Sequence, residues 1–147
     1  MKISKQGIEL IKKYEGFKPY AYLCPAKILT IGYGHTGGVR IGQTCTETEA
    51  EQFLKEDLEI AEAEVNKVVN EVELTQGQFD SLVSFTFNVG AGNFQTSTLR
   101  KKVLNNPADP TIVREFGKWV YFLGKVSLGL QKRRLEESKL YFKFLSL

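Results

Sequence analysis

The chain has 147 residues, of which 42% are hydrophobic and 25% are charged, so it has the size of one globular domain and a composition that excludes disorder over most of its length. No apolar run approaches the ~18 residues of a membrane span, and one histidine without a CxxC pair argues against a metal site. The net charge of +3 is uneven: residues 1–99 carry 9 basic and 13 acidic side chains, and residues 100–147 carry 11 basic and 4 acidic.

This basic second part suits an anionic polymer such as nucleic acid or cell wall, and it equally suits an ordinary solvated helical surface. The two cysteines, Cys24 and Cys45, are too few for a disulfide framework, and the sequence leaves open whether they pair with each other. We therefore expect neither a metal nor a cofactor.

The first predicted element is an amphipathic helix over residues 3–13, because its isoleucine and leucine side chains mostly share one face at helical spacing. It ends near Glu15-Gly16, since glycine commonly terminates helices and Pro19 prevents continuation. The charged N-terminus has no apolar stretch resembling a signal-peptide core, so we expect no export signal in the chain as written.

A small sheet is predicted next, between Phe17 and Gly42. Short runs of aromatic and β-branched residues, AYL, ILTIGYG and VRI, alternate there with the turn-forming segments CPAK and HTGG. This pattern indicates a small antiparallel sheet or a pair of hairpins.

Only helices are expected after the sheet. Thr46 and Glu49 match a capping box at the start of a helix that runs to about Asn70. Thr75 and Gln78 match a second one before FDSLVSFTFNVG, which is apolar nearly all round and is predicted to be the central buried helix, ended by Gly90. Further helices are predicted at about 96–105, 111–120 and 130–143, and we assign to the core Phe79, Leu82, Val83, Phe85 and Phe87. The fold class is α+β, with the sheet segregated near the N-terminus.

Three side chains near the predicted sheet are candidates for catalysis. Glu15 is flanked by Tyr14 and Phe17, and desolvation by such neighbours can raise the pKa of a carboxyl as a general acid requires, although a glutamate in a last helical turn is usually just solvated. Thr30 could hold a water from a strand, and Cys24 could act as a nucleophile or base if its thiol ionised. From residue type alone, a plain structural role is the favourite for both.

The order and spacing of these residues change that balance. The pattern Glu15-x8-Cys24-x5-Thr30, followed by TIGYGH, closely resembles the Glu-x8-(Asp or Cys)-x5-Thr pattern of the phage-type lysozymes, or endolysins, of glycoside hydrolase family 24. DSLVSFTFNVGAGNFQTSTLRKK is similar to the family's central helix and following loop, and GLQKRRLEESKLY to its C-terminal helix. The resemblance covers about residues 3–143.

The resemblance implies a lysozyme-like fold in a single catalytic domain over residues 1–147. Its small sheet lobe would span about 14–60, its helical lobe would span about 70–147 with the N-terminal helix, and a long helix would join the lobes around a glycan-binding cleft. It also implies hydrolysis of the β-1,4 bond between N-acetylmuramic acid and N-acetylglucosamine in bacterial peptidoglycan.

The resemblance further implies roles for the three candidates. Glu15 would protonate the leaving glycosidic oxygen, Cys24 would be the second catalytic group, and Thr30 would position the attacking water. A thiol at the second position is a variant within the family, and it leaves open whether the group acts as base or as nucleophile. For His35 the resemblance suggests a structural role that ties the sheet to a neighbouring element.

Substrate contacts are expected from both parts of the chain. The expected contacts are aromatic and glycine residues near the sheet and polar residues of the helical part: Tyr22, Tyr33, Gly34, Asn88, Gln95 and Arg133. Aromatic residues at such spacings are more often part of the core. Two adjacent arginines on a helix point about 100° apart, so we expect only one of Arg133 and Arg134 to face the cleft.

Two alternatives belong to other classes of protein. One is a non-catalytic peptidoglycan-binding module, and the other is a nucleic-acid-binding protein, for which no recognised motif is present. The family resemblance implies a monomer made in the host cytoplasm, which acts on the periplasmic or external cell wall after release by a separate pore-forming protein.

Overall fold

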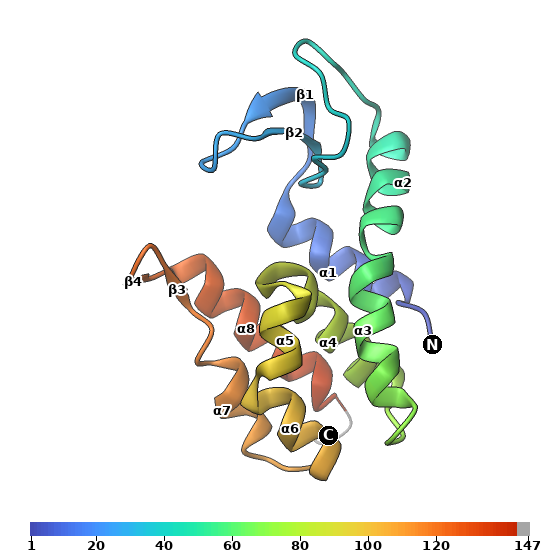
Figure 1. Ribbon diagram of the computed structural model, residues 1–147, viewed down its shortest axis with the longest axis vertical. Coiled ribbons are helices and arrows are strands. Elements are labelled where there is room, and N and C mark those ends of the chain that lie inside the picture. The colour runs from blue at the N-terminus through green and yellow to red at the C-terminus, as the bar shows by residue number, and fades with distance from the viewer. Residues whose placement is uncertain (144–147) are drawn as a thin grey trace. The chain divides into compact units, whose positions relative to one another are not determined.

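The computed structural model describes residues 1–143, in which helices are combined with two small two-stranded sheets (Figure 1). The expected α+β class is therefore confirmed. The chain divides into two compact units. We call Glu9–Glu59 the sheet unit, and Met1–Ile8 together with the chain from Ile60 onward the helical unit. None of the helices in the described part of the chain has the length and apolar character that a membrane span requires.

The sheet unit contains most of helix α1 (Lys5–Glu15) and an antiparallel hairpin of β1 (Lys18–Leu23) and β2 (Leu29–Gly32). The expected sheet is present, but its third apolar run, residues 39–41, is not a strand. The segment that follows meets β1 through one isolated bridge, Tyr20 with Thr44.

Helix α2 (Glu47–Asp57) begins at Thr46 with the predicted capping box, in which the Thr46 hydroxyl and the Glu49 carboxylate each accept an amide hydrogen bond from the other residue's backbone. The predicted single helix to Asn70 is instead divided at Leu58 into α2 and α3 (Glu59–Val69). Aspartate is a poor helix former, and the Asp57 carboxylate lies 2.8 Å from His35 Nδ1. This contact is far away in the sequence, so the helical period could not reveal it.

Helix α4 (Gln76–Val89) is the centre of the helical unit, as predicted. Thr75 and Gln78 form its capping box, residues 79–86 are all buried, and Gly90 ends it at φ 97°. Phe87, which we assigned to the core, is only half-buried, since the continuously buried part of α4 ends at Thr86. Helix α8 (Leu128–Tyr141) packs along α4.

Three shorter helices complete the unit: α5 (Ala91–Thr96), α6 (Thr98–Asn105) and α7 (Ile112–Phe116). Edge-to-face ring contacts join Phe85 of α4 to Phe94, Phe116 and Trp119, at centroid distances of 5.6–6.3 Å. These rings connect α4 to α5 and to the α7 region, which places the aromatic core around Phe85.

A second hairpin contradicts the expectation that only helices follow the first sheet. The predicted helix over 111–120 stops at Phe116, and β3 (Tyr121–Phe122) pairs with β4 (Lys125–Val126). The turn uses Leu123 at φ 51° and Gly124 at φ 78°. Gly124 predicted a break between helices here, but leucine is uncommon at positive φ, so the sequence did not indicate a two-residue hairpin turn.

Candidate active site

Glu15 is the last residue of α1, and its carboxylate lies against the backbone of Gly34. Gly16, at φ 72°, turns the chain from α1 toward β1. Gly34 has φ 83°, and a Cβ atom at that position would lie 3.0 Å from Glu15 Oε1. Glycine therefore allows both the left-handed backbone and the close approach of the carboxylate. Glu15 itself is half-buried.

Cys24 begins the tight turn that joins β1 to β2. Its amide donates to the Ile28 carbonyl at 3.1 Å, and the Lys27 amide donates to the Cys24 carbonyl at 2.7 Å, with Lys27 at φ 62°. Hydrogen bonds from the Ile28 amide and from the Thr30 side chain lower the pKa of the Cys24 thiol. This turn therefore favours the thiolate, which is the reactive form.

Thr30 lies in β2 and is 4% exposed. Its hydroxyl donates to the Ile28 carbonyl at 2.9 Å, and it also lies within hydrogen-bond reach of the Cys24 thiol. The hydroxyl proton serves one acceptor at a time, and the oxygen lone pairs can separately accept a hydrogen bond from a donor such as water. The structure thus brings Cys24 and Thr30 together.

The two tyrosines predicted to contact substrate have different surroundings. Tyr22 pairs with Thr30 across the hairpin and is exposed. Tyr33 is only 4% exposed, its hydroxyl donates to Glu47 Oε1 at 3.0 Å, and its ring packs against Phe17. Burial and the Glu47 carboxylate raise the pKa of Tyr33. Tyr33 therefore ties the sheet to α2, and only Tyr22 offers an accessible ring.

His35 has the structural role that was predicted for it. Its Nδ1 lies 2.8 Å from Asp57 Oδ2, and its ring stacks on Phe53 at a centroid distance of 4.4 Å and an interplanar angle of 12°. Both partners belong to α2, so His35 fastens the end of the hairpin to that helix.

In the helical unit, Arg133 and Arg134 are both buried beside Glu137. Arg133 Nε lies 3.4 Å from Glu137 Oε2, and Arg134 Nε lies 2.8 Å from Glu137 Oε1. Arg133 also donates to the Ser84 carbonyl at 3.2 Å. Burial lowers the pKa of Arg134 to about 10, which leaves it charged at neutral pH. Both arginines reach Glu137 because it lies within one helical turn of each, and the expectation that only one of them faces the cleft stays a prediction.

The other two predicted contact residues also have protein partners. Asn88 Oδ1 accepts a hydrogen bond from Arg134 Nη2 at 2.8 Å. A hydrogen bond with Gln95 is the largest of the effects that lower the pKa of Glu64. Both side chains belong to exposed residues.

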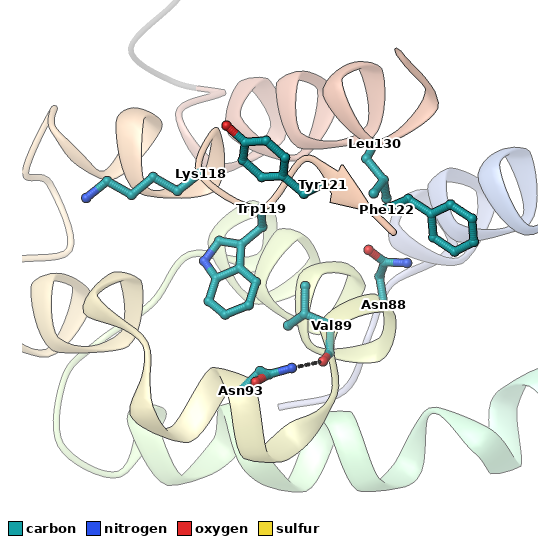
Figure 2. A pocket seen from close by; sticks show the side chains of 8 residues that line it. All are labelled: Asn88, Val89, Asn93, Lys118, Trp119, Tyr121, Phe122 and Leu130. Atoms are coloured by element: carbon teal, nitrogen blue, oxygen red, sulfur yellow. Dashed lines mark hydrogen bonds between the residues drawn. The ribbon is translucent and has the colours of Figure 1, made fainter. Parts of the chain in front are cut away.

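Asn88 lines a cavity of about 550 Å³ in the helical unit (Figure 2). Its other walls come from α4, α5, the segment between α7 and β3, β3 itself and α8: Val89, Asn93, Lys118, Trp119, Tyr121, Phe122 and Leu130. The Asn93 side chain donates to the Val89 carbonyl at 2.7 Å. Sequence reasoning missed this cavity because it depended on a hairpin that was not predicted. The chain's one tryptophan, close before a glycine-containing apolar run, was the available signal.

Comparison with known proteins shows the family of this chain. A family model described as phage lysozyme matches residues 12–137. The chain belongs to the phage lysozyme family. It is 43% identical over 145 residues to an endolysin of Acyrthosiphon pisum secondary endosymbiont phage 1, which covers 96% of this chain and 98% of that relative.

Two further matches define the extent of the similarity. An endolysin of Bacillus phage PZA is 42% identical over 96% of this chain, but the chain spans only 55% of that relative's length. The solved muramidase domain of SpmX from Asticaccaulis excentricus is 36% identical, with a TM-score of 0.86 and coverage of 95% of this chain and 97% of that one. The phage lysozyme fold is thus present over nearly the whole chain. As a member of this family it is a glycoside hydrolase of the lysozyme kind, and peptidoglycan hydrolysis in the cell wall is its general activity.

Proposed function

We propose that this chain is an endolysin that acts as a muramidase, hydrolysing the β-1,4 bond between N-acetylmuramic acid and N-acetylglucosamine. The observation that carries the proposal is the position of the Glu15 carboxylate against Gly34, in the same unit as the Cys24–Thr30 pair. The similarity to a solved muramidase domain supports the choice of bond.

Glu15 acts as the general acid in this proposal. It donates a proton to the glycosidic oxygen as the bond from that oxygen to the sugar's anomeric carbon breaks. A half-buried carboxyl beside a glycine leaves room for the sugar oxygen to approach. The leaving sugar then departs as a neutral alcohol, which is easier to expel than an alkoxide.

Cys24 is the second catalytic group, and Thr30 positions the water. The thiolate accepts a proton from a water held at the Thr30 hydroxyl, and the water oxygen bonds to the anomeric carbon opposite the leaving group. The lowered pKa of Cys24 supports this role because only the thiolate can accept the proton. The product then has inverted configuration. Retained configuration would instead assign Cys24 as the nucleophile.

The remaining predicted residues are proposed substrate contacts. Tyr22 would stack on a sugar ring, and the Gly34 backbone would approach the sugar at the Glu15 position. Asn88 and Gln95 are proposed contacts from the helical unit, whereas Arg133, which is 3% exposed and held by Glu137 and Ser84, is not. The buried ring of Tyr33 is not part of this proposal, because it packs against Phe17 and binds Glu47.

The biological setting is also a proposal. The chain would act as a single catalytic domain and as a monomer, since one unit holds all three proposed catalytic residues. It would be made in the host cytoplasm and reach the wall through a separate pore-forming protein. The sheet lobe and helical lobe predicted from the family would correspond to the two compact units.

The test is clearing of purified peptidoglycan by Glu15→Gln, which keeps the side chain's size and removes the transferable proton. The expected loss is ~10²–10⁴-fold, as for other general acids. Glu9→Gln is the matched control, because Glu9 lies on the same helix and is exposed. We expect it to clear the wall at the normal rate.

Two other outcomes would contradict the proposal. If both variants clear the wall equally well, Glu15 is not the acid. If the unaltered protein binds the wall without releasing reducing ends, the chain is a wall-binding module. Mass analysis of the released fragments tests the bond, since a muramidase leaves N-acetylmuramic acid at the reducing end.

A further inference from the structure

The β3–β4 hairpin and the first residue of α8 carry an unusual concentration of exposed apolar side chains. Residues 121–128 contain five large ones with more than half of their surface exposed: Tyr121 64%, Phe122 55%, Leu123 87%, Val126 51% and Leu128 73%. Such a concentration of exposed apolar side chains within eight residues indicates an interaction site on a protein surface. We call residues 121–128 the apolar hairpin.

The turn of the apolar hairpin places its most exposed side chain at the tip. Leu123 and Gly124 both have positive φ, 51° and 78°, in a two-residue connection between β3 and β4. Asparagine or glycine would adopt this conformation at lower cost than leucine. Folding alone therefore does not account for a leucine at this position.

The charges around the apolar hairpin have one sign. Between residues 113 and 135 every exposed charged side chain is basic: Arg114, Lys118, Lys125 and Lys132. The acidic residue in this range, Glu115, is 3% exposed and pairs with Lys102 and Lys118. Burial opposes ionisation of Glu115, but hydrogen bonds from the two lysines outweigh it and lower its pKa. The exposed charges in the sequence that contains and flanks the apolar hairpin are therefore all positive.

We propose that the apolar hairpin is an anchor for anionic phospholipid bilayers, in which Phe122 and Leu123 enter the headgroup region while Lys125 and Lys132 pair with lipid phosphates. Apolar side chains beside lysines are the composition of membrane-interface segments, and anionic lipid attracts each nearby cation. Tyr121, at the base of the strand, has the amphipathic ring that such interfaces favour.

Other partners fit these residues less well. Sugars are bound by aromatic faces together with hydrogen-bonding side chains. Tyr121 and Phe122 at the base of the hairpin line the cavity with Asn88, whereas the tip, residues 123–126, has no aromatic ring. The Ser127 hydroxyl is held at the start of α8, where it accepts a hydrogen bond from the Leu130 amide. A second copy of the chain would bring two cationic surfaces together, which is unfavourable.

The experiment is co-sedimentation of the full chain with vesicles of phosphatidylcholine alone and with vesicles that contain about one third phosphatidylglycerol, a mixture chosen for its anionic surface. We expect binding to the anionic vesicles and much weaker binding to the neutral ones. Leu123→Asn suits the positive φ, so it should fold normally and weaken binding by about tenfold. Lys125→Gln should weaken it by about fivefold.

Two control variants lie elsewhere in the helical unit. Ile60→Gln removes an apolar side chain that is 69% exposed on α3, and Lys101→Gln removes an exposed lysine of α6. Neither should change vesicle binding by more than about twofold, since a single distant lysine is screened at moderate salt.

Three results would overturn the proposal. If the Leu123→Asn variant and the unaltered protein bind anionic vesicles equally well, the apolar hairpin is not a membrane anchor. If the Leu123→Asn variant binds vesicles as the unaltered protein does but clears lipid-free peptidoglycan more slowly, the apolar hairpin is a wall contact. Self-association that Leu123→Asn abolishes, without vesicle binding, would make it an interface between copies. The Glu15→Gln variant should bind vesicles normally, because Glu15 is not part of the apolar hairpin. The vesicle assay and the clearing assay therefore test the two proposals separately.

Discussion

The contact between Gly34 and Glu15 shows how one glycine can control the position of the proposed acid. At Gly34 the positive φ and the 3.0 Å distance from a hypothetical Cβ to Glu15 Oε1 act together. Gly38 has a similar φ of 69°, but no heavy atom lies within 4 Å of its Cβ position. Substitutions at the two glycines therefore distinguish the effect of backbone strain from the effect of contact with the Glu15 carboxylate.

Gly34→Ala should lower both stability and activity, and Gly38→Ala should lower stability alone. Each alanine would be strained at positive φ, by about 1–2 kcal/mol. Only the Gly34 methyl displaces the carboxylate, and displacement of a catalytic group by about 1 Å can cost ~10²-fold in rate. Thermal unfolding and peptidoglycan clearing measure the two effects. Equal activity of both variants would show that this contact does not position Glu15.

Cys24→Asp should shift the pH dependence of kcat/KM to lower pH. A model aspartate ionises near pH ~3.9 and a model cysteine near ~8.5. The Ile28 amide and the Thr30 side chain lower the pKa of Cys24, but a thiol still ionises at higher pH than a carboxyl. The limb of the profile on which activity rises with pH should therefore move toward acid in the variant. An unchanged profile would mean that ionisation of Cys24 is not required.

At the scale of elements, the hairpin of the candidate site is held by helix α2. His35 binds Asp57 and stacks on Phe53, and Tyr33 binds Glu47 near the start of the same helix. Gly32 lets β2 come close to α2, because a Cβ atom there would lie 2.9 Å from the Ala50 Cβ. These contacts determine the position of the strand that carries Thr30, so α2 supports the site without contributing a catalytic group.

Replacing His35 and Asp57 by alanine, singly and together, should reveal a coupling energy of about 1–2 kcal/mol in the free energy of unfolding. A double-mutant cycle isolates the interaction energy of the pair. The His35 side chain is 13% exposed and the Asp57 side chain is 30% exposed. His35 transfers no proton in our proposal. Clearing of peptidoglycan well below the unfolding temperature should therefore change by less than about tenfold, whereas removing a general base costs ~10²–10⁴-fold. A loss of that size in a folded variant would make His35 catalytic.

At the scale of the whole molecule, the two units differ in charge. The sheet unit carries 6 basic and 8 acidic side chains, and the helical unit carries 14 basic and 9 acidic. The helical unit is therefore the part that attracts an anionic polymer. Two of its cations, Arg133 and Arg134, are buried beside Glu137, so its exposed lysines provide most of this field.

Clearing of the wall should slow as ionic strength rises. The Debye length falls from about 30 Å at 0.01 M to about 3 Å at 1 M, so long-range attraction disappears over this range. The effect should appear mainly in KM, because the proposed catalytic groups lie inside the sheet unit. Initial rates at several substrate concentrations separate the two parameters. A decrease confined to kcat would contradict this view of the helical unit.

The sequence by itself determined the features that depend on neighbours a few residues apart. The capping boxes at Thr46 and Thr75 and the buried character of α4 were all predicted, because backbone hydrogen bonds and helical period are local. The spacing of Glu15, Cys24 and Thr30 also predicted the family, and their catalytic roles remain a proposal.

The tertiary structure decided what depends on contacts between distant residues. It divided a predicted helix at Leu58, where Asp57 meets His35, and placed the ring of Tyr33 in the core against Phe17. It also formed the β3–β4 hairpin around a leucine at positive φ. Such features follow from packing, which can override local propensity by contacts that no short stretch of sequence contains.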